Sequence, residues 1–336
     1  MESVNWQGVL LSSAAEKIPR SLSSHCCGRN CPVSGIVTIS KEVADRNHVP
    51  TWADLKTEFG RSIPVHVSPS YRLEDTSDRS ILGHCKADVG FCIGWQRLLP
   101  QWFLDLHRNG VFGMHACANR LPNGRGRSPI NWSVIEGATS LYAHIFRYND
   151  QPDAGDLLSA PKITIEAHDD IQTLQQKARV IFNHEVIRNW NDLVSGSIRL
   201  LPLNSSGEPE RFYPKRDADD GAIDWHWPAS QIVNWVRAQT RPYPGAFTTA
   251  DGVRYPVWRC GPTGVSSSEP AGTITETFRD GTCYVAAGDQ TCLHLLDHEL
   301  PIHAEHSVSF GGTAGTGQGT TELTRSALTT GKRLGT

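Results

Sequence analysis

One histidine and one aspartate stand where their side chains could act together on protons. His115 closes an apolar run from Gly110 to His115, and Asp153 lies in the turn-like stretch 151–157, QPDAGDL. An imidazole titrates near neutral pH, so it can donate a hydrogen bond to a developing oxyanion or carry a proton. A carboxylate beside it can hold the ring in the useful tautomer. Taken alone, His115 could equally be a structural histidine at a strand end whose hydrogen bonds are all made within the protein. Asp153 could equally be a solvated turn residue.

The loop after His115 carries two arginines, each of which follows a glycine. Arg125 and Arg127 lie in the stretch NGRGRSP, which begins at Asn123. The planar guanidinium suits a phosphate or a carboxylate, because it can donate two parallel hydrogen bonds. The residues therefore predict an anchor for an anionic substrate, with a purely structural role for the two arginines as the alternative.

The first half of the chain predicts the elements that would position these side chains. Short apolar runs that predict strands alternate with polar, helix-like stretches, and the runs cover residues 8–12, 35–39, 63–67, 87–95 and 110–115. A short helix is expected over 52–59 with Thr51 as its N-cap, and a long amphipathic helix from the cap Asp169. This order predicts an α/β fold: a mostly parallel, Rossmann-like sheet with helices on both faces. Such sheets bind ligands outside the carboxyl ends of their strands, where His115 falls.

The second half of the chain has a different pattern of predicted elements, with one helix and several short strands. Residues 203–209 read as a linker, residues 228–239 as a helix, and the runs 246–248, 255–258, 273–277, 282–286 and 292–296 as short strands. Short strands joined by glycine-containing turns favour a small β-barrel-like domain of the OB type. We therefore expect a catalytic domain over 1–203, a β-rich domain over 204–310 and a disordered, Gly- and Thr-rich tail over 311–336.

Composition and missing motifs exclude several classes of function. No GxGxxG follows the first predicted strand and no GxxxxGK[ST] occurs, so the fold does not imply NAD or ATP. The formal net charge of −3 argues against a general nucleic-acid binder. No stretch is apolar for the roughly 20 residues that span a bilayer, and no export signal precedes the first predicted strand, so we expect a cytoplasmic protein without a membrane partner.

The cysteines predict reduced thiols. There are 9 of them, an odd number spread over 336 residues. The cluster His25, Cys26, Cys27 and Cys31 matches no paired zinc spacing, so no metal is predicted, and a metal at that cluster is the alternative.

Two blocks of sequence carry a family resemblance. The first runs over 111–132, VFGMHACANRLPNGRGRSPINW, and is followed by Asp153 and Gly155; the second combines DGAIDW at 220–225 with RPYPGAF at 241–247. Together they resemble the folate-dependent formyltransferases, among them methionyl-tRNA formyltransferase and the sugar N-formyltransferases. The resemblance covers roughly residues 80–260. It rests on the ordered set of motifs, since each motif alone is short.

The resemblance implies a reaction, a donor and a set of site residues. The donor would be 10-formyltetrahydrofolate, with tetrahydrofolate as product, and an amine would attack its formyl carbon. His115 and Asp153 would be the catalytic pair. The folate would lie against Gly94, Trp95, Gln96, Leu98 and Leu99 on one side and Phe146, Tyr148 and Asp150 on the other. The acceptor would contact Gly113, Met114, Arg125, Arg127 and Ser128.

The chain departs from the family pattern at one position. The family has an asparagine two residues before its histidine, and that residue helps to hold the formyl oxygen, whereas Gly113 stands here. One oxyanion donor is therefore missing from the pattern. We expect retained activity, with Asn119 or a bound water in place of the asparagine.

Several amines could serve as the acceptor. The first choice is the amino group of a nucleotide-linked amino sugar, because the His-x-Ser-Leu-Leu-Pro run typical of the tRNA enzyme is absent and the chain has no basic surplus. Alternatives are an amino acid side chain such as hydroxyornithine in siderophore assembly, methionyl-tRNA, plain hydrolysis to formate, and a catalytically inactive folate- or sugar-nucleotide-binding protein. Whether the chain forms a homodimer stays open.

Overall fold

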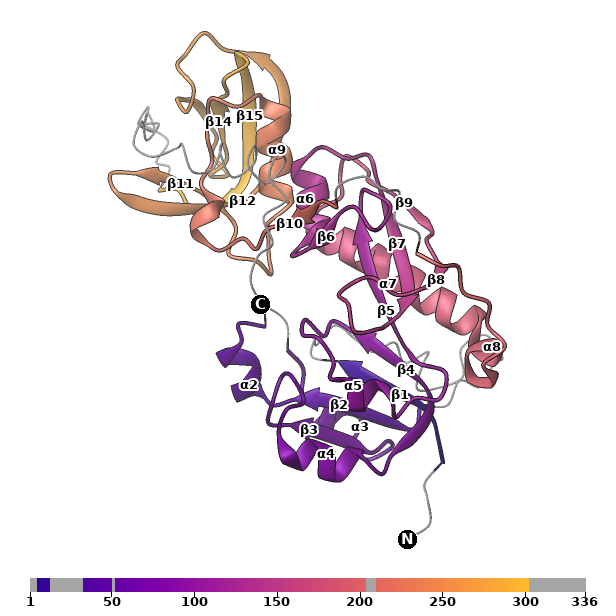
Figure 1. The fold of residues 1–336 in the computed structure, drawn as a ribbon. Coiled ribbons are helices and arrows are strands. Elements are labelled where there is room, and N and C mark those ends of the chain that lie inside the picture. The colour runs from indigo at the N-terminus through magenta and orange to yellow at the C-terminus, as the bar shows by residue number, and fades with distance from the viewer. Residues whose placement is uncertain (1–4, 13–32, 50–51, 204–209, 302–336) are drawn as a thin grey trace. The chain divides into compact units, whose positions relative to one another are not determined.

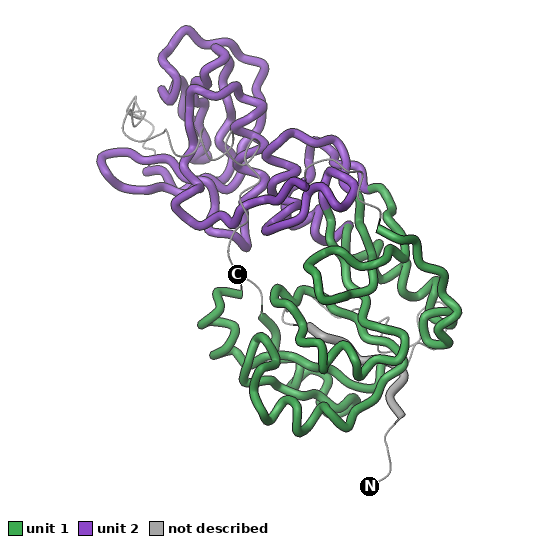
Figure 2. The backbone as a smooth tube through the Cα atoms, viewed as in Figure 1, with its two compact units in different colours: residues 1–116, 142–162, 178–207 green, residues 117–141, 163–177, 208–336 purple. Residues whose placement is uncertain are grey.

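The computed structural model describes residues 5–12, 33–49, 52–203 and 210–301. Two compact units divide the chain, each built from several segments (Figure 2). The first comprises residues 1–116, 142–162 and 178–207, and the second residues 117–141, 163–177 and 208–336. The predicted division at residues 203 and 310 stays a prediction, since 204–209 and 302–336 lie outside the described residues, as do Thr51 and the cluster at 25–31.

The main sheet has eight strands, most of them paired in parallel (Figure 1). In sheet order they are β3 (Val65–Ser68), β2 (Gly35–Ile39), β1 (Asn5–Ser12), β4 (Lys86–Ile93), β5 (Val111–Cys117), β7 (Ser140–Arg147) and β8 (Leu157–Ser159), with β9 (Lys162–Thr164) paired to β7. The pairs from β3 to β5 are parallel, and β8 is antiparallel to β7. The strand order reverses between β1 and β4, which is the kind of switch point at which open α/β sheets bind ligands.

Helices cover both faces of the sheet. The helices α2 (Lys41–Arg46), α4 (Thr76–Leu82) and α5 (Gln101–Leu104) share one apolar cluster, while α3 (Leu55–Phe59), α7 (Ile171–Arg188) and α8 (Trp190–Ser195) share the other. Alternate strand residues divide between them: Val111 belongs to the first cluster and Phe112 to the second. The predicted α/β class is confirmed, and we call the side of Val111 the α2–α5 face.

Two predicted helix starts are wrong. Helix α3 begins at Leu55, where the side chain of Asp54 accepts from the Thr57 amide at 3.0 Å. Helix α7 is capped by Asp170, which accepts from the Thr173 amide at 2.9 Å. The carboxylate of Asp169 does not cap the helix. It accepts hydrogen bonds from the Glu166 amide at 2.7 Å and from Lys177 Nζ at 2.5 Å.

The second unit contains a five-stranded antiparallel sheet in the order β11 (Ala246–Ala250), β12 (Val253–Ser266), β15 (Thr291–His298), β14 (Cys283–Ala286) and β13 (Ile274–Thr277). Helix α9 (Ala229–Arg237) packs on it through Ile232, Trp235 and Val236. The remaining elements are β6 (Arg125–Gly126), α6 (Pro129–Ile135), β10 (Phe212–Tyr213) and the 3₁₀ helix η1 (Asp219–Gly221). Strand β12 is longer than predicted, because its Pro256 and Pro262 do not end it and register shifts occur along its pairing with β15.

None of the helices within the described residues combines the length and the apolar composition that a membrane span requires.

Candidate active site

His115 lies near the end of the central strand β5, on the α2–α5 face. It follows Val111 and Gly113 on that face, because side chains of a strand alternate. Its side chain is only 6% exposed. The carbonyl of His115 accepts a hydrogen bond from Nδ1 of His144, a fully buried residue of β7, at 3.2 Å. His144 therefore holds the backbone that carries His115, and no feature of the sequence pointed to it.

Asp153 meets His115 as predicted. Its Oδ2 lies 3.3 Å from Nδ1 of the imidazole, and its side chain is 27% exposed. The two residues are far apart in the sequence, and the loop between β7 and β8 brings them together. The separation is long for a hydrogen bond, as is common for catalytic pairs before substrate binds.

The loop that carries Asp153 is tied to the end of β7. The Arg147 amide donates to the carbonyl of Asp156 at 3.0 Å. Gly155 lies so close to this strand that a Cβ there would be 1.5 Å from the Arg147 carbonyl oxygen. Asp153 itself has φ +51°, an uncommon conformation for a residue with a side chain. The glycine is thus required for the close approach that positions the carboxylate.

Tyr148, predicted as part of the folate wall, reaches the strand that carries His115. Its amide donates to the Val111 carbonyl at 2.7 Å, and its ring stacks on Phe146 at 5.4 Å. Its hydroxyl faces the thiol of Cys92 on β4, and the interaction of the two groups favours the protonated phenol. Burial, with smaller effects of Cys92 and Asp153, raises the pKa of Tyr148 well above its ordinary value, and burial raises the pKa of Cys92 to about 11. Both groups are therefore neutral at neutral pH.

The predicted folate segment follows β4 and combines buried and exposed groups. Trp95 is 6% exposed, and its Nε1 has no hydrogen-bond partner among the described residues. The Gln96 amide donates to the Tyr71 hydroxyl at 3.0 Å. Gly94 has φ +69°, Leu99 packs against the core, and Leu98 is 63% exposed. A buried donor without a partner beside an exposed apolar side chain fits a segment that takes up a flat, polar-edged ring.

The other predicted folate and acceptor residues of the first unit divide by surroundings. Phe146 is fully buried and Asp150 exposed. Met114 packs against the cluster on the opposite face from His115, so only its backbone can face His115 and Asp153.

The remaining predicted residues belong to the second unit. The Asn119 carbonyl accepts from the Cys117 thiol at 3.0 Å. Arg125 pairs with Glu210 at 3.0 Å, whereas Arg127 is exposed and has no ion pair within the part of the chain that the structure describes. Ser128 has φ +53° and precedes α6. Their roles as acceptor contacts, and that of Asn119 in catalysis, stay predictions.

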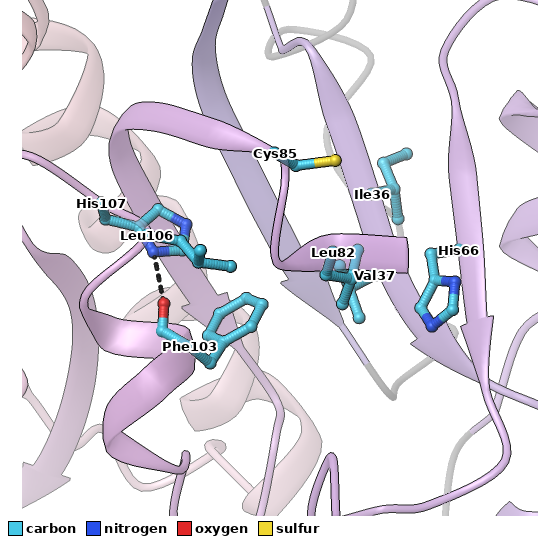
Figure 3. A pocket seen from close by; sticks show the side chains of 8 residues that line it. All are labelled: Ile36, Val37, His66, Leu82, Cys85, Phe103, Leu106 and His107. Carbon is cyan, nitrogen blue, oxygen red and sulfur yellow. Dashed lines mark hydrogen bonds between the residues drawn. The ribbon is translucent and has the colours of Figure 1, made fainter. Parts of the chain in front are cut away.

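A small cavity in the first unit is lined by none of the predicted site residues (Figure 3). Its volume of about 20 Å³ leaves room for about one water, so it cannot hold a folate or a sugar. His107 borders it and donates from Nδ1 to the Phe103 carbonyl at 2.9 Å (Figure 3). Burial lowers the pKa of His107 to about 4.

Comparisons with known proteins agree with this architecture. The family profile described as "Formyl transferase" matches residues 28–188, and that described as "Formyl transferase, C-terminal domain" matches residues 215–307. The methionyl-tRNA formyltransferase of Bacillus velezensis is 28% identical over 266 residues, which are 79% of this chain and 81% of that protein.

Solved structures share the fold at low sequence identity. The N-formyltransferase from Helicobacter canadensis, in complex with folinic acid and dTDP-3-aminofucose, has a TM-score of 0.59 at 11% identity, over 86% of this chain and 98% of that one. HypX from Aquifex aeolicus, in complex with tetrahydrofolic acid, has a TM-score of 0.57 at 14% identity over 93% of this chain. The match covers 47% of HypX, so this chain spans about half of its length.

Both family profiles fall on the two parts of the chain that carried the resemblance, in the same order. The resemblance is thereby confirmed. The chain belongs to the formyl transferase family, whose members transfer a formyl group and use 10-formyltetrahydrofolate as its donor.

Proposed function

We propose that this chain transfers the formyl group of 10-formyltetrahydrofolate to a primary amine, and that this amine belongs to a nucleotide-linked amino sugar. The observation that carries the transfer chemistry is the contact of His115 Nδ1 with Asp153 Oδ2 at 3.3 Å. An imidazole and a carboxylate in contact can serve as proton donor and acceptor in one step.

The reaction needs a base, an oxyanion donor and a leaving group. The amine nitrogen bonds to the formyl carbon, and Asp153 takes the proton that the nitrogen gives up. His115 donates a hydrogen bond to the formyl oxygen, which becomes an oxyanion. The bond from the formyl carbon to N10 of the folate then breaks, and the proton passes to N10. The formamide and tetrahydrofolate together contain all the atoms of the two reactants.

The segment that follows β4 supports a folate site beside this pair. The unpartnered Nε1 of Trp95 can donate to an acceptor on the pterin edge, and Leu98 can cover an apolar ring face. The stacked rings of Phe146 and Tyr148 offer a second aromatic wall, at the end of β7.

Two observations favour a nucleotide-linked amino sugar as the acceptor. Arg127 is an exposed guanidinium in the loop after the catalytic strand, and this group binds phosphate well. The Helicobacter canadensis enzyme, which shares this fold along almost its whole length, was crystallised with a nucleotide-linked amino sugar. Methionyl-tRNA is the second candidate, because a curated relative carries out that reaction. The formal net charge of −3 speaks against it, since tRNA binding gains affinity from neutralised phosphates.

The acceptor is tested by competition among amines. Purified protein with 10-formyltetrahydrofolate is supplied with a dTDP-linked amino sugar, hydroxyornithine or methionyl-tRNA, and the release of tetrahydrofolate is followed. We expect release with the amino sugar and loss of that release in His115→Ala, while His84→Ala, a change of an exposed histidine, retains it. Turnover with methionyl-tRNA alone would assign the second candidate. Release of formate without any amine would identify a hydrolase.

A further inference from the structure

The position that lacks the family asparagine is filled by another side chain. A Cβ built on Gly113 would lie 2.3 Å from the Tyr148 hydroxyl oxygen, 2.4 Å from Cε1 and 2.5 Å from Cζ. These distances are shorter than real Cβ contacts allow. Gly113 has no unusual φ that would call for glycine. The glycine therefore leaves space for the phenol of Tyr148.

This phenol lies next to the catalytic histidine. Residues 113 and 115 point to the same face of β5, and their Cβ positions along a strand are about 7 Å apart. The Tyr148 hydroxyl thus lies where the first atoms of a side chain at position 113 would lie. This is the side of the sheet that carries the imidazole of His115. A formyl oxygen placed between the two residues would be within reach of both.

The ring of Tyr148 is held in this place from three directions. Its amide is bonded to the Val111 carbonyl, its ring stacks on Phe146, and its hydroxyl meets the Cys92 thiol. The interaction with Cys92 raises the pKa of Tyr148 and lowers that of Cys92, so the phenol O–H is directed at the sulfur. Because sulfur is a weak acceptor, this O–H can turn to a formyl oxygen placed beside it, so Cys92 is a positioning residue for Tyr148.

We propose that the hydroxyl of Tyr148 donates a hydrogen bond to the formyl oxygen and replaces the amide that Gly113 cannot supply. This inference rests on the proposed formyl transfer. It names a residue other than Asn119 for the missing donor, and it makes Tyr148 a catalytic residue rather than only a wall of the folate site. A neutral phenol suits the task, because it can donate to an oxygen that gains charge in the transition state.

The test is Tyr148→Phe, which keeps the ring, its stacking and its backbone bond. We expect kcat for tetrahydrofolate release to fall about 100- to 1000-fold, with KM for 10-formyltetrahydrofolate within about threefold of the wild type. Tyr255→Phe, in β12 of the second unit, serves as the matched control and should retain full activity. A kcat of Tyr148→Phe within about threefold of the wild type would overturn the inference.

A second pair of variants separates catalysis from packing. In Tyr148→Leu the phenol is gone and space opens at Gly113, so Gly113→Asn can be added without the clash. We expect the double variant to exceed Tyr148→Leu in kcat by about tenfold or more, since the amide restores a donor. A merely structural role of Tyr148 predicts no such rescue, and a double variant no faster than Tyr148→Leu counts against the proposal.

Binding of the labelled donor tests the same contact when no acceptor is turned over. With 10-formyltetrahydrofolate carrying a ¹³C formyl group, the infrared band of the bound carbonyl should lie at lower frequency in the wild type than in Tyr148→Phe. An unshifted band would refute the contact. A wild type that binds the donor with the shifted band yet transfers to no amine would refute the proposed function and leave this inference standing.

Discussion

The surroundings of His115 and Asp153 differ in a way that suits different tasks. The imidazole is almost fully buried and lies on a central strand whose carbonyl is held by His144. The carboxylate is more open and lies on a loop. A fixed ring can be aimed at a developing oxyanion, while a carboxylate nearer to solvent can take up and release a proton.

Tyr148 and Gly113 show how one substitution depends on another. Any side chain at 113 would overlap the phenol, so the glycine and the tyrosine must change together. The sequence marks the departure at Gly113, but it does not show what fills the space. The answer depends on a contact between β5 and the end of β7, which no local pattern encodes.

The buried imidazole of His107 should make the free energy of unfolding depend on pH. Its pKa is lowered from the ordinary 6.5 to about 4 by burial. Between these values the unfolded chain binds a proton that the folded protein does not, so the free energy of unfolding falls as the pH falls below 6.5. At pH 5 the loss from this one group is about 2 kcal/mol.

Urea unfolding of His107→Asn at pH 7 and pH 5 checks this. The amide can still donate to the Phe103 carbonyl but does not titrate, so the variant should lose less stability between the two pH values than the wild type. His84→Asn, at an exposed position, should behave as the wild type does. An identical loss in His107→Asn and wild type would show that His107 does not titrate as stated.

At the scale of elements, the five strands up to Cys117 were predictable, whereas β7, β8, β9 and the helix caps were not. Parallel strands buried on both faces are continuous apolar runs, and GIVTI at 35–39 is confirmed residue for residue as β2. The starts of α3 and α7 were misplaced because several adjacent residues, such as Asp169 and Asp170, can cap equally well by type. Asp169 is instead held by the Glu166 amide and by Lys177 of α7 itself, which leaves Asp170 as the cap.

The same reason explains which site residues were found. His115 and Asp153 lie in motifs with a recognisable order, and their contact is confirmed. His144 and Cys92 support the site through the neighbouring strands β7 and β4. Both read as ordinary core residues in the sequence, because their importance comes from what lies beside them in the sheet.

The close packing of the loop between β7 and β8 leads us to expect that one added methyl group, in Gly155→Ala, lowers kcat. Gly155→Ala would place a Cβ against the Arg147 carbonyl, so the loop must move and carry Asp153 with it. A displacement of about 1 Å at such a site costs about 100-fold in rate. We expect kcat to fall by that order, as measured by tetrahydrofolate release.

A glycine elsewhere provides the control for this variant. A Cβ at Gly261, in β12, would meet only Leu296 at 3.9 Å, which is an ordinary contact. Gly261→Ala should therefore retain the rate. Full activity in Gly155→Ala would mean that the close approach to β7 does not position Asp153.

At the scale of the whole molecule, both units contain thiols that the folded state keeps neutral; Cys92 and Cys283 are buried and Cys260 is half-buried. Burial raises the pKa of Cys92 in the first unit to about 11, and those of Cys260 and Cys283 in the second to about 12, from an ordinary 9.0. Above pH 9 the unfolded chain releases these protons and the folded chain keeps them. Stability must therefore fall as the pH rises from 9 towards 11.

Thermal or urea unfolding in the presence of a reductant measures this fall. Each such thiol contributes about 1.4 kcal/mol of loss at pH 10, so Cys283→Ala, although less stable at pH 8, should show a shallower decline between pH 8 and pH 10. A decline as steep as that of the wild type would contradict the assignment.

The most direct test of the account is whether the imidazole and the carboxylate act as one unit. Tetrahydrofolate release is measured for wild type, His115→Asn, Asp153→Asn and the double variant, with Asp251→Asn, an exposed turn residue, as control. We predict that each single change lowers kcat by about 100- to 10,000-fold and that the double variant is scarcely slower than the worse single one. Single variants near the wild-type rate, or losses that multiply in the double variant, would contradict it.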